Sequence, residues 1–496
     1  MTRKLFAILH EKYGTPPDSL TRRRVLKDAL AATAGILLSN TLTHAEDGAR
    51  PKGGGKRVLV VGAGLAGLAA SYELASAGYE VTTVEARKRI GGRVVTFRDL
   101  VEGKTIEGGG EFVGRNHPTW LAYAKRFDLK LREISRDLLK EFPVILEGKR
   151  LTASESRKLW LDMERTVQGL NGEAAAVNAA EPWRTANAQT LDLQTAGGWI
   201  AGLKVARLTK LGLQAQFIGD AGVPPLWQSY LSLLAHVKGG GLEKFWTDSE
   251  SYRCDGGNQQ LAEKLAQGLG KNRLQTGCPV REISAQPGSM IVTLADGKRL
   301  QVDDVVLATP PSTWRRIAFD PPLPSILAPQ MATHVKFLAV LKSRFWRAAG
   351  LSAESLTDGP VNMTWEATSG QPNDAGACLT VFAGGNAADT GREWDGKERV
   401  DSYLSALEQL YPGIRKNFQS DRFMNWPSDP WTKASYSCPA PGEITRIGAL
   451  LHEGVGRLHF AGEHTSYGFG GYMEGALESG VRVAKKLAKR DGVIKE

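Results

Sequence analysis

The stretch that most constrains the fold runs from Val58 to Arg93 and reads VLVVGAGLAGLAASYELASAGYEVTTVEARKRIGGR. Two short apolar runs flank a helical pattern, which is typical of a buried parallel βαβ unit. Gly62, Gly64 and Gly67 have GxGxxG spacing, which provides a tight turn, close backbone approach to a pyrophosphate and close helix–strand packing. Glu85 ends the second run, where a carboxylate accepts hydrogen bonds from a ribose. The unit predicts a dinucleotide site at the helix N-terminus rather than an ordinary glycine-rich turn.

The residues that follow Glu85 indicate which kind of dinucleotide the site binds. Arg87 and the run Gly91-Gly92-Arg93 form the pattern E-x-R-x-R-x-G-G-R. This pattern is similar to the flavin branch of dinucleotide folds, in which the second glycine pair and its arginine lie near the cofactor phosphates. A guanidinium suits that place because it can bind two phosphate oxygens at once.

Composition fits a large globular protein. The 496 residues are 42% hydrophobic and 23% charged, which allows two or three domains. The net charge is +10, but no run of Lys and Arg is interleaved with aromatic residues, so we do not expect nucleic acid as a partner. Cys254, Cys278, Cys378 and Cys438 show no CxxC spacing, so we expect no metal site and mostly free, buried thiols.

Residues 1–45 have the features of an export signal. Residues 21–27, TRRRVLK, resemble the twin-arginine signal, and a modestly apolar stretch and the small-x-small sequence at 43–45 follow. The apolar stretch is too short and interrupted to span a bilayer, and an uncleaved amphipathic anchor is the alternative. Residues 46–55 are expected to be a flexible linker. We expect the twin-arginine machinery to export the folded protein, which would then be periplasmic or secreted.

The rest of the sequence predicts two interleaved domains. Residues 56–115, 252–312 and 424–490 carry the glycine-rich turns and buried strands of a nucleotide domain. Residues 116–251 are mostly helical in pattern, and residues 313–423 mix strands with helix, so we assign both to a substrate-binding domain. The predicted fold class is α/β, a Rossmann-like FAD-binding domain interleaved with an α+β substrate-binding domain.

Apolar periodicity also predicts individual elements. The expected helices are Thr119–Phe127, Ser154–Leu170, Pro224–His236, Gln259–Leu269, Asp401–Tyr411 and a last helix from the 470–476 stretch to Arg490. The expected strands after the βαβ unit are Val280–Ile283, Met290–Leu294, Leu300–Leu307, Phe337–Leu341, Leu379–Phe382 and Leu458–Ala461.

Five motifs, taken together and in order, resemble the flavin-containing amine oxidase family of monoamine oxidases, polyamine oxidases and L-amino-acid oxidases. They are GAGLAGL at 62–68, RIGGR at 89–93, ATPP at 308–311, KFLAVLKSRFW at 336–346 and FAGEHTS…GGYMEGALESG at 460–480. The resemblance extends from about Lys56 to Lys489 and implies the GR2-type fold of these flavoproteins.

The resemblance also implies roles for single residues. Lys336 matches the lysine that holds a water against flavin N5, Trp426 would flank the flavin, and Tyr472 matches one wall of the aromatic cage that guides the amine; these are the candidate catalytic residues. The residues expected to bind FAD are Gly62, Gly64, Ala66, Gly67, Glu85, Ala86, Arg87, Gly92, Arg93, Gly109, Gly110, Glu111, Val280, Gly462, Glu463, Gly471, Tyr472 and Met473.

The sequence departs from the family pattern at the flavin and at the cage. Animal monoamine oxidases attach FAD through a cysteine whose place here is Ala434, so the resemblance implies non-covalent FAD. The second cage aromatic falls at Ser435, and Tyr436 or Trp431 are candidates to replace it. We expect His334 to be a structural histidine rather than a pocket residue.

A further departure concerns the substrate carboxylate. L-amino-acid oxidases carry a G-x-M-R run whose arginine clamps that carboxylate, and Glu111 and Phe112 stand in its place here. Arg115 and Arg253 remain as candidate clamps. The candidate substrate residues are therefore Phe112, Arg115 and Ser435.

The function that the resemblance implies is FAD-dependent oxidative deamination. A primary amine or an L-amino acid would be converted to an imine and then a carbonyl compound, and O2 would be reduced to hydrogen peroxide. The alternative is desaturation of a C–C bond by the same fold, against which export and the GYMEG cage argue. A nicotinamide-dependent dehydrogenase is disfavoured because the periplasm lacks free NAD(P)H. The expected partners are a small amine or amino acid and O2, and we also consider a homodimer.

Overall fold

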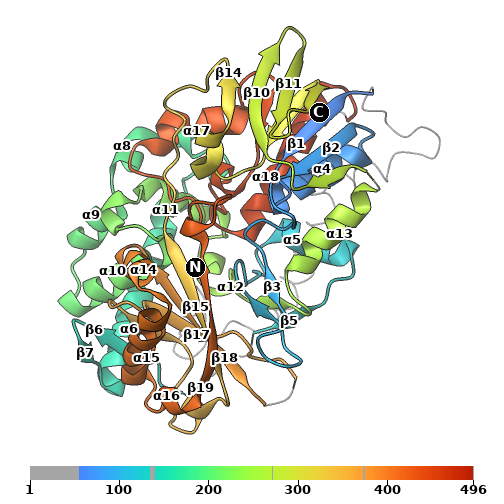
Figure 1. Cartoon of the computed structure of the whole chain (residues 1–496). Coiled ribbons are helices and arrows are strands. Elements are labelled where there is room, and N and C mark those ends of the chain that lie inside the picture. Colours follow the sequence, from blue (N-terminus) through green and yellow to red (C-terminus); the bar gives the residue numbers. More distant parts are fainter. Residues whose placement is uncertain (1–54, 135–139, 271, 373–374, 495–496) are drawn as a thin grey trace.

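The computed structural model describes residues 55–494 except 135–139, 271 and 373–374. The expected export signal, and all of the expected linker except Gly55, lie outside the described residues. The described chain forms two lobes, and the polypeptide passes between them several times (Figure 1). Within the described residues, no helix combines the length and the apolar character that crossing a membrane requires.

A parallel sheet forms the centre of the nucleotide lobe, at the top of Figure 1. Its order is β20-β13-β1-β2-β9, and its strands are β1 (Arg57–Val61), β2 (Glu80–Glu85), β9 (Leu274–Thr276), β13 (Asp304–Leu307) and β20 (Leu458–Phe460). The helix α4 (Leu65–Ser76) connects β1 to β2, and it packs with α18 (Met473–Arg490) on one face of the sheet. The predicted βαβ unit is therefore confirmed.

The expected strand Leu300–Leu307 is wrong as a single element. The chain forms β12 (Arg299–Val302) in an antiparallel sheet of order β12-β11-β10-β14, and after Asp303 it enters the parallel sheet as β13. Asp303 fixes this switch because its carboxylate accepts the Arg57 N–H at 2.7 Å and its own N–H donates to the Arg57 carbonyl at 2.8 Å. The other strands of the antiparallel sheet are β10 (Val280–Gln286), β11 (Ser289–Leu294) and β14 (Ala318–Asp320).

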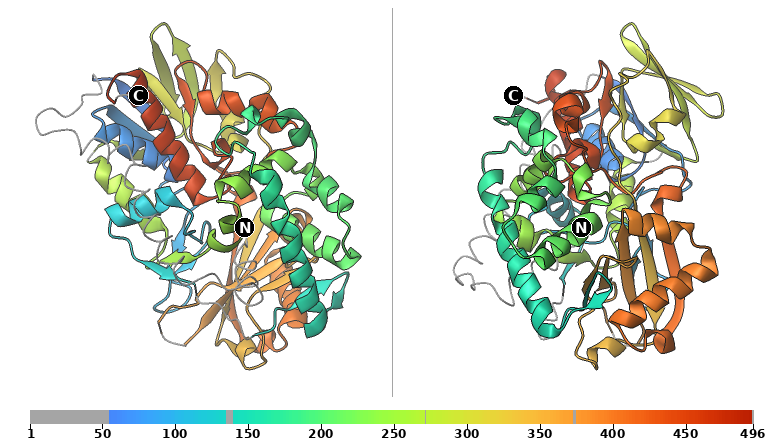
Figure 2. Two further views of the ribbon diagram at one scale, coloured as in Figure 1. Left: turned by 180° about the vertical axis from the view of Figure 1, so that it is seen from behind. Right: turned by 90° about the vertical axis from the view of Figure 1, so that its left-hand side faces the viewer.

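A long mixed sheet organises the second lobe. Its order is β19-β15-β18-β17-β16-β6-β7, and its strands are β6 (Val144–Leu146), β7 (Lys149–Arg150), β15 (His334–Leu341), β16 (Ser355–Thr357), β17 (Met363–Glu366), β18 (Ala377–Gly384) and β19 (Phe418–Asn425). The helices α6 (Ala153–Gln168), α10 (Arg207–Ala221) and α11 (Tyr230–Gly239) cover one face, and α15 (Gly396–Leu410) covers the other (Figure 2).

The expected helix Pro224–His236 is interrupted. A 3₁₀ turn η2 (Pro225–Trp227) precedes α11, and the chain between them is extended at Gln228. Ser229 caps α11, because its side chain accepts the Ser232 N–H at 3.2 Å. A serine in this position favours a new helix start over continuation, and apolar spacing alone did not reveal it.

The remaining helices, turns and short strands complete the two lobes. The helices are α5 (Pro118–Arg126), α7 (Leu170–Ala174), α8 (Ala188–Leu193), α9 (Ala196–Gly202), α12 (Glu243–Asp248), α13 (Gln259–Leu269), α14 (Asn386–Glu393), α16 (Ile414–Asn417) and α17 (Glu443–Glu453). The 3₁₀ turns are η1 (Pro182–Arg184), η3 (Pro311–Arg316), η4 (Phe345–Arg347), η5 (Trp426–Ser428) and η6 (Glu463–Thr465), and the short strands are β3 (Thr96–Phe97), β4 (Ile106–Glu107), β5 (Leu131–Glu133) and β8 (Tyr252–Cys254). All four cysteines are free, and Cys254, Cys378 and Cys438 are buried, as expected.

Candidate functional site

A large cavity lies where the two lobes meet, and it holds about 1760 Å³ of empty space with its open mouth included. Residues of both lobes line it, from Gly62 after β1 to Trp365 on β17. Every residue expected to bind FAD lines it except Gly67, and so do the candidate catalytic residues Lys336, Trp426 and Tyr472.

The turn between β1 and α4 forms one end of the cavity. Gly62 has φ +107°, which a residue with a side chain rarely adopts. A Cβ on Gly67 would lie 1.9 Å from the Gly62 carbonyl oxygen, whereas a Cβ on Gly64 would meet nothing nearer than the Gly92 Cα at 4.0 Å. Gly67 thus serves packing, and Gly64 leaves open space beside the helix. Because α4 starts at Gly64 without a side-chain cap, its first N–H groups suit a phosphate.

Glu85 lies at the end of β2 with both carboxylate oxygens oriented by the backbone. One oxygen accepts the Ala63 N–H at 2.8 Å and the other accepts the Arg87 N–H at 2.9 Å. Each oxygen keeps a lone pair for another donor, which suits a ribose diol. Ala66, Ala86 and Val280 also line the cavity.

Arg93 and Glu463 join the first and last parts of the chain at the middle of the cavity. Arg93 Nη1 lies 2.9 Å from Glu463 Oε1 and also donates to the Ser435 carbonyl at 2.6 Å. Glu463 further accepts the Ser437 hydroxyl at 2.7 Å and the Gly471 N–H at 2.7 Å. Burial would raise the pKa of Glu463, but the charge of Arg93 and these hydrogen bonds hold it below its usual range.

The N-terminus of α18 completes this side. Tyr472 is its N-cap residue and supplies no side-chain cap, and Tyr472 and Met473 both line the cavity. Gly110 packs so closely that a Cβ there would lie 2.9 Å from Met473 Cγ. The helix therefore directs its positive end toward the cavity.

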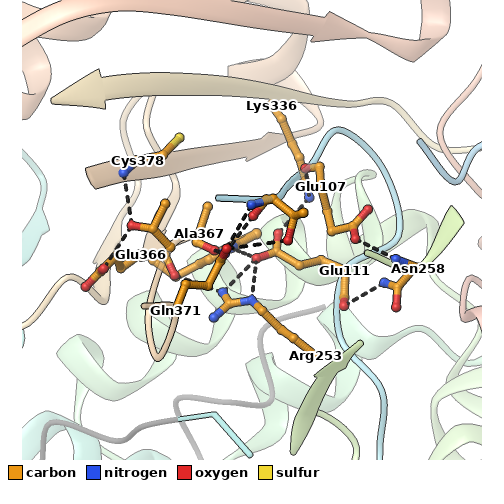
Figure 3. Close-up of polar contacts among 12 residues, drawn as sticks. Glu107, Glu111, Arg253, Asn258, Lys336, Glu366, Ala367, Gln371 and Cys378 are labelled. Atoms are coloured by element: carbon orange, nitrogen blue, oxygen red, sulfur yellow. Dashed lines mark hydrogen bonds and ion pairs between the residues drawn. The ribbon is translucent and has the colours of Figure 1, made fainter. Parts of the chain in front are cut away.

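Lys336 reaches the cavity from β15 and is fully hydrogen-bonded (Figure 3). Its ammonium donates to the Gly109 carbonyl at 2.7 Å, the Glu107 carbonyl at 3.3 Å and Glu111 Oε2 at 3.0 Å. A lysine has three N–H donors, so these three acceptors account for all of them.

Glu111 is the centre of a buried charge cluster rather than an open cofactor ligand. Its Oε1 accepts from Arg253 Nη2 at 2.7 Å and from the Trp365 indole N–H at 3.0 Å. Its side chain is 3% exposed. Burial would raise the pKa of Glu111, but the charges of Lys336 and Arg253 outweigh burial and keep that pKa below its usual range.

The substrate end of the cavity has an aromatic wall. Successive ring centroids lie 5.5 Å apart for Phe112 and Trp365, 5.4 Å for Trp365 and Phe382, 4.8 Å for Phe382 and His334, and 4.4 Å for His334 and Tyr436. All five residues line the cavity, together with Trp431 and the buried Glu250. We call Phe112, Trp365, Phe382, His334 and Tyr436 the aromatic wall.

Ser435 and His334 form a polar pair at this wall, so His334 is both a pocket residue and a structural one. Its Nε2 donates to the Gly219 carbonyl at 3.0 Å. Burial lowers the pKa of His334 to about 3, so the ring is neutral and Nδ1 accepts the Ser435 hydroxyl at 2.8 Å. Trp426 lies elsewhere in the cavity, where its indole N–H donates to the Gly108 carbonyl at 3.1 Å.

The two arginines considered as carboxylate clamps do not line the cavity. Arg115 lies outside it, where its guanidinium pairs with Glu133 and Tyr252. Arg253 lies behind the wall, 5.0 Å from the Phe112 ring, with Glu111 as its ionic partner. Both expectations fail for one reason, since each guanidinium is already paired with a carboxylate of the protein.

Sequence reasoning missed Trp365, Phe382 and Glu250 as cavity residues. Trp365 and Phe382 lie on neighbouring strands, β17 and β18, and Glu250 precedes β8. Nothing in their local sequence distinguishes them from core residues. The pairing of these strands is what brings them to the cavity.

A glycine-rich βαβ turn, an oriented acid and a buried lysine beside an aromatic wall point to a dinucleotide-dependent oxidoreductase. A model of the flavin containing amine oxidoreductase family matches residues 65–488, and the chain belongs to this family. The family carries out flavin-dependent amine oxidation, and the fold is the amine oxidase flavoprotein fold.

Curated relatives and solved structures agree with this assignment. A putative flavin-containing monoamine oxidase of Mycobacterium tuberculosis is 30% identical over 450 residues, which cover 87% of this chain and 96% of that protein. An L-amino acid dehydrogenase of Synechocystis is 28% identical over 456 residues, covering 86% and 94%. Putrescine oxidase, in a structure with putrescine bound, has a TM-score of 0.77 and 26% identity and covers 88% of this chain and 99% of its own.

Proposed function

We propose that the protein oxidises an amine that carries no α-carboxylate, with O2 as the electron acceptor. The amine would lose two electrons and two protons to give an imine, which water hydrolyses to a carbonyl compound and ammonia or a smaller amine, while O2 becomes hydrogen peroxide. The observation that carries the proposal is the aromatic wall, where the neighbouring cations Lys336 and Arg253 are both already bonded to Glu111.

The residues of the cavity fit FAD. Gly64 and the uncapped start of α4 would hold the pyrophosphate, Glu85 the ribose, and Arg93 with Glu463 the centre of the cofactor. When bound, FAD supplies the acceptor for the hydride equivalent of the amine and passes its electrons to O2.

We also propose that the FAD is bound non-covalently. Ala434 offers no thiol where animal monoamine oxidases have one. Among the described residues that line the cavity, the single thiol is that of Cys278, which is near Glu85 at the ribose end. Precipitation with acid should therefore release all the flavin into solution, and flavin that stays with the pellet would contradict this proposal.

The protein would prepare the amine by desolvating and orienting it. Burial against Tyr472 and the aromatic wall disfavours an ammonium and so favours the neutral, reactive amine. The lone pair on the Ser435 oxygen can accept an amine N–H, because the hydroxyl hydrogen is directed to His334. The positive end of α18 would stabilise negative charge on the reduced cofactor.

The charges at the substrate end favour an amine over an L-amino acid. Of the cations that line the cavity among the described residues, Lys336 is the one that lies against a ring of the aromatic wall, that of Trp365, and its three N–H groups are directed to protein acceptors. Glu250 adds an acidic group to the same region. A substrate carboxylate would thus meet no clamp and would lie near another carboxylate.

A peroxide-coupled screen with matched pairs tests this proposal. Each pair is a primary amine and the L-amino acid with the same side chain, for example phenethylamine and L-phenylalanine, so that the members differ only in the carboxylate. We expect turnover of amines and at least tenfold lower kcat/KM for the matched amino acids. Preference for the amino acids would overturn the choice of substrate, and peroxide from neither panel would favour desaturation.

We further propose export by the twin-arginine machinery to the periplasm or the medium, which residues 21–27 support. Changing Arg22, Arg23 and Arg24 together to lysine should leave the protein in the cytoplasm. Unchanged export of this variant, measured by cell fractionation, would contradict the proposal.

A further inference from the structure

Ser435 and His334 form a buried polar contact within the substrate end of the cavity, and the backbone fixes its place. Their side chains line the cavity, and Ser435 Oγ lies 2.8 Å from His334 Nδ1. The Ser435 N–H donates to the Ala332 carbonyl at 2.9 Å, and the Ala332 N–H donates to the Tyr436 carbonyl at 2.8 Å. Because these bonds join the two segments, the contact is a fixed feature of the substrate end.

Ser435 is also connected to the centre of the proposed cofactor site. Its carbonyl accepts Arg93 Nη1 at 2.6 Å, and Arg93 Nη1 lies 2.9 Å from Glu463 Oε1. Glu463 in turn accepts the N–H of Gly471, the residue before Tyr472, at 2.7 Å. An amine that Tyr472 guides toward the cofactor would therefore pass Ser435.

The hydrogen bonds of His334 decide which way the Ser435 hydroxyl points. The Gly219 carbonyl lies 3.0 Å from His334 Nε2 and can only accept, so Nε2 carries the ring hydrogen. The Tyr436 hydroxyl donates to the Asp220 carbonyl at 2.6 Å, so its oxygen, 2.8 Å from the same Nε2, is an acceptor there as well. Burial lowers the pKa of His334 to about 3, so the ring is neutral and Nδ1 must accept the hydroxyl hydrogen. The Ser435 oxygen is thus left as an acceptor.

We propose that Ser435 and His334 select amines that carry at least one N–H. Ser435 would accept an N–H of the neutral amine, and His334 is the positioning residue, because it holds the hydroxyl hydrogen away from the substrate. The inference rests on the proposed function and names its substrates as primary and secondary amines. A neutral tertiary amine has no N–H, so it would meet the lone pairs of the Ser435 oxygen with a lone pair of its own.

The hydrogen bond to Ser435 would orient the amine rather than supply most of its binding. Apolar rings leave rotation about the C–N bond free, whereas an acceptor fixes it and keeps the α-carbon toward the cofactor. Loss of the bond should therefore lower the rate constant of flavin reduction more than it raises the dissociation constant of the amine. A merely structural role of either residue would change all amines alike.

Three amines that differ only at the nitrogen test the proposal: phenethylamine, its N-methyl derivative and its N,N-dimethyl derivative. Each is mixed anaerobically with the purified flavoprotein, and the loss of oxidised-flavin absorbance gives the limiting rate constant and the dissociation constant. Loss of one hydrogen bond predicts that the third amine reduces the flavin about tenfold more slowly than the first two. Ser435→Ala should slow the first two amines about tenfold and leave the third unchanged.

Variants of His334 show whether it acts through Ser435. His334→Leu removes the acceptor, frees the hydroxyl to turn, and should reduce the preference for amines with an N–H. His334→Asn places an amide oxygen at the position of Nδ1 and should restore that preference. The double variant Ser435→Ala/His334→Leu should show the same ratios among the three amines as Ser435→Ala, and a further change would overturn the positioning role. If His334→Leu does not fold, His334→Gln replaces it, since its amide can still donate to the Gly219 carbonyl but offers no acceptor at Nδ1.

Ser355→Ala is the matched control in the same lobe. The Ser355 side chain is buried, and its hydroxyl lies 2.7 Å from that of Thr364, but it does not line the cavity. Its replacement should leave the ratios among the three amines unchanged. A change like that of Ser435→Ala would show that loss of any buried hydroxyl alters the selection, and would refute the role of Ser435.

The outcomes separate this inference from the proposed function. A flavin that no amine reduces, in protein that a chemical reductant does reduce, would refute amine oxidation and the inference with it. A flavin that all three amines reduce, and that Ser435→Ala slows equally for all three or not at all, would refute only the selection. Equal slowing would show that the Ser435 hydroxyl donates to the amine nitrogen, because such a bond serves a tertiary amine as well.

Discussion

Arg93 Nη1 and Glu463 Oε1 lie 2.9 Å apart, although 370 residues separate them in the sequence. The pair connects the first glycine-rich segment to the segment before α18, and both residues line the cavity. Because Glu463 also orients Ser437 and Gly471, one ion pair arranges both sides of the proposed flavin site.

Arg93→Ala should reduce both flavin content and stability. It leaves a carboxylate that is 5% exposed without its cation, and loss of one partner of a buried pair costs about 3–5 kcal/mol. Arg57→Ala is the control, because Arg57 is 47% exposed and lies 3.8 Å from Asp303, so its loss should cost less than about 1 kcal/mol. Equal effects of the two changes on urea unfolding and on the ratio of flavin to protein absorbance would refute the special role of Arg93.

Alanine at two neighbouring glycines should have different effects. Gly67→Ala places a methyl group 1.9 Å from the Gly62 oxygen, so the protein without flavin should itself be destabilised by at least about 1–3 kcal/mol. Gly64→Ala points its methyl group into open space and should leave the melting temperature of the flavin-free protein unchanged while weakening FAD binding. Tight FAD binding by Gly64→Ala would contradict the proposed position of the pyrophosphate.

Glu107 should give stability a pH dependence of known sign. Burial raises the pKa of Glu107 to about 7 from an ordinary value of 4.5. Between these values the folded protein binds the proton more tightly than the unfolded chain, so this group lowers stability as the pH rises from 4.5 to 7. Above pH 7 its full cost, about 3 kcal/mol, is present.

Glu107→Gln removes that titration, and its amide oxygen in the place of Oε1 can still accept both the Asn258 N–H and the Thr96 hydroxyl. The variant should therefore gain stability relative to the unchanged protein at pH 8 but not at pH 4.5. The comparison is made by chemical unfolding at both pH values. A difference that is the same at the two values would show that Glu107 does not titrate in this range.

We expect the aromatic ring of Tyr472, and not its hydroxyl, to contribute to kcat/KM for amines. Its ring contacts His117 and Phe469 edge-on, with centroids 5.3 and 6.4 Å away, so its orientation is fixed. Tyr472→Leu should lower kcat/KM for amines by about tenfold, the size of one lost aromatic contact. Tyr472→Phe keeps the ring and should stay within about threefold. A large loss in the Phe variant would instead assign the role to the hydroxyl.

Local signals explain which parts of the fold were predictable. The β1–α4–β2 unit, α13 and α18 follow from glycine spacing and apolar periodicity, which act within a few residues. The pair Asp303-Asp304 interrupts the apolar alternation of Leu300–Leu307, but such a break does not say that the two halves join different sheets, which the partner strands decide. The interruption at Ser229 differs, because its cause is a local one, the N-cap serine, which apolar spacing does not detect.

The residues of the candidate site also divide into those that local sequence could predict and those that depend on tertiary contacts. The roles of glycines and acids at strand ends follow from the residues next to them in the sequence, so Gly64 and Glu85 could be proposed from the sequence. Whether a buried arginine is available to bind a ligand depends on its partner, and the pairing of Arg253 with Glu111 is a tertiary contact. Sequence could therefore suggest Arg253 as a carboxylate clamp, and only the structure shows that its guanidinium is already paired with Glu111.

Anaerobic mixing of the purified flavoprotein with a primary amine is the most direct test of the central claim. Without O2 the electrons from the amine remain on the cofactor, so the visible absorbance of the oxidised flavin should disappear with the amine and return when air is admitted with formation of peroxide. The matched L-amino acid should bleach the flavin much more slowly. A flavin that no amine bleaches, in protein that chemical reductants do bleach, would contradict amine oxidation as the function.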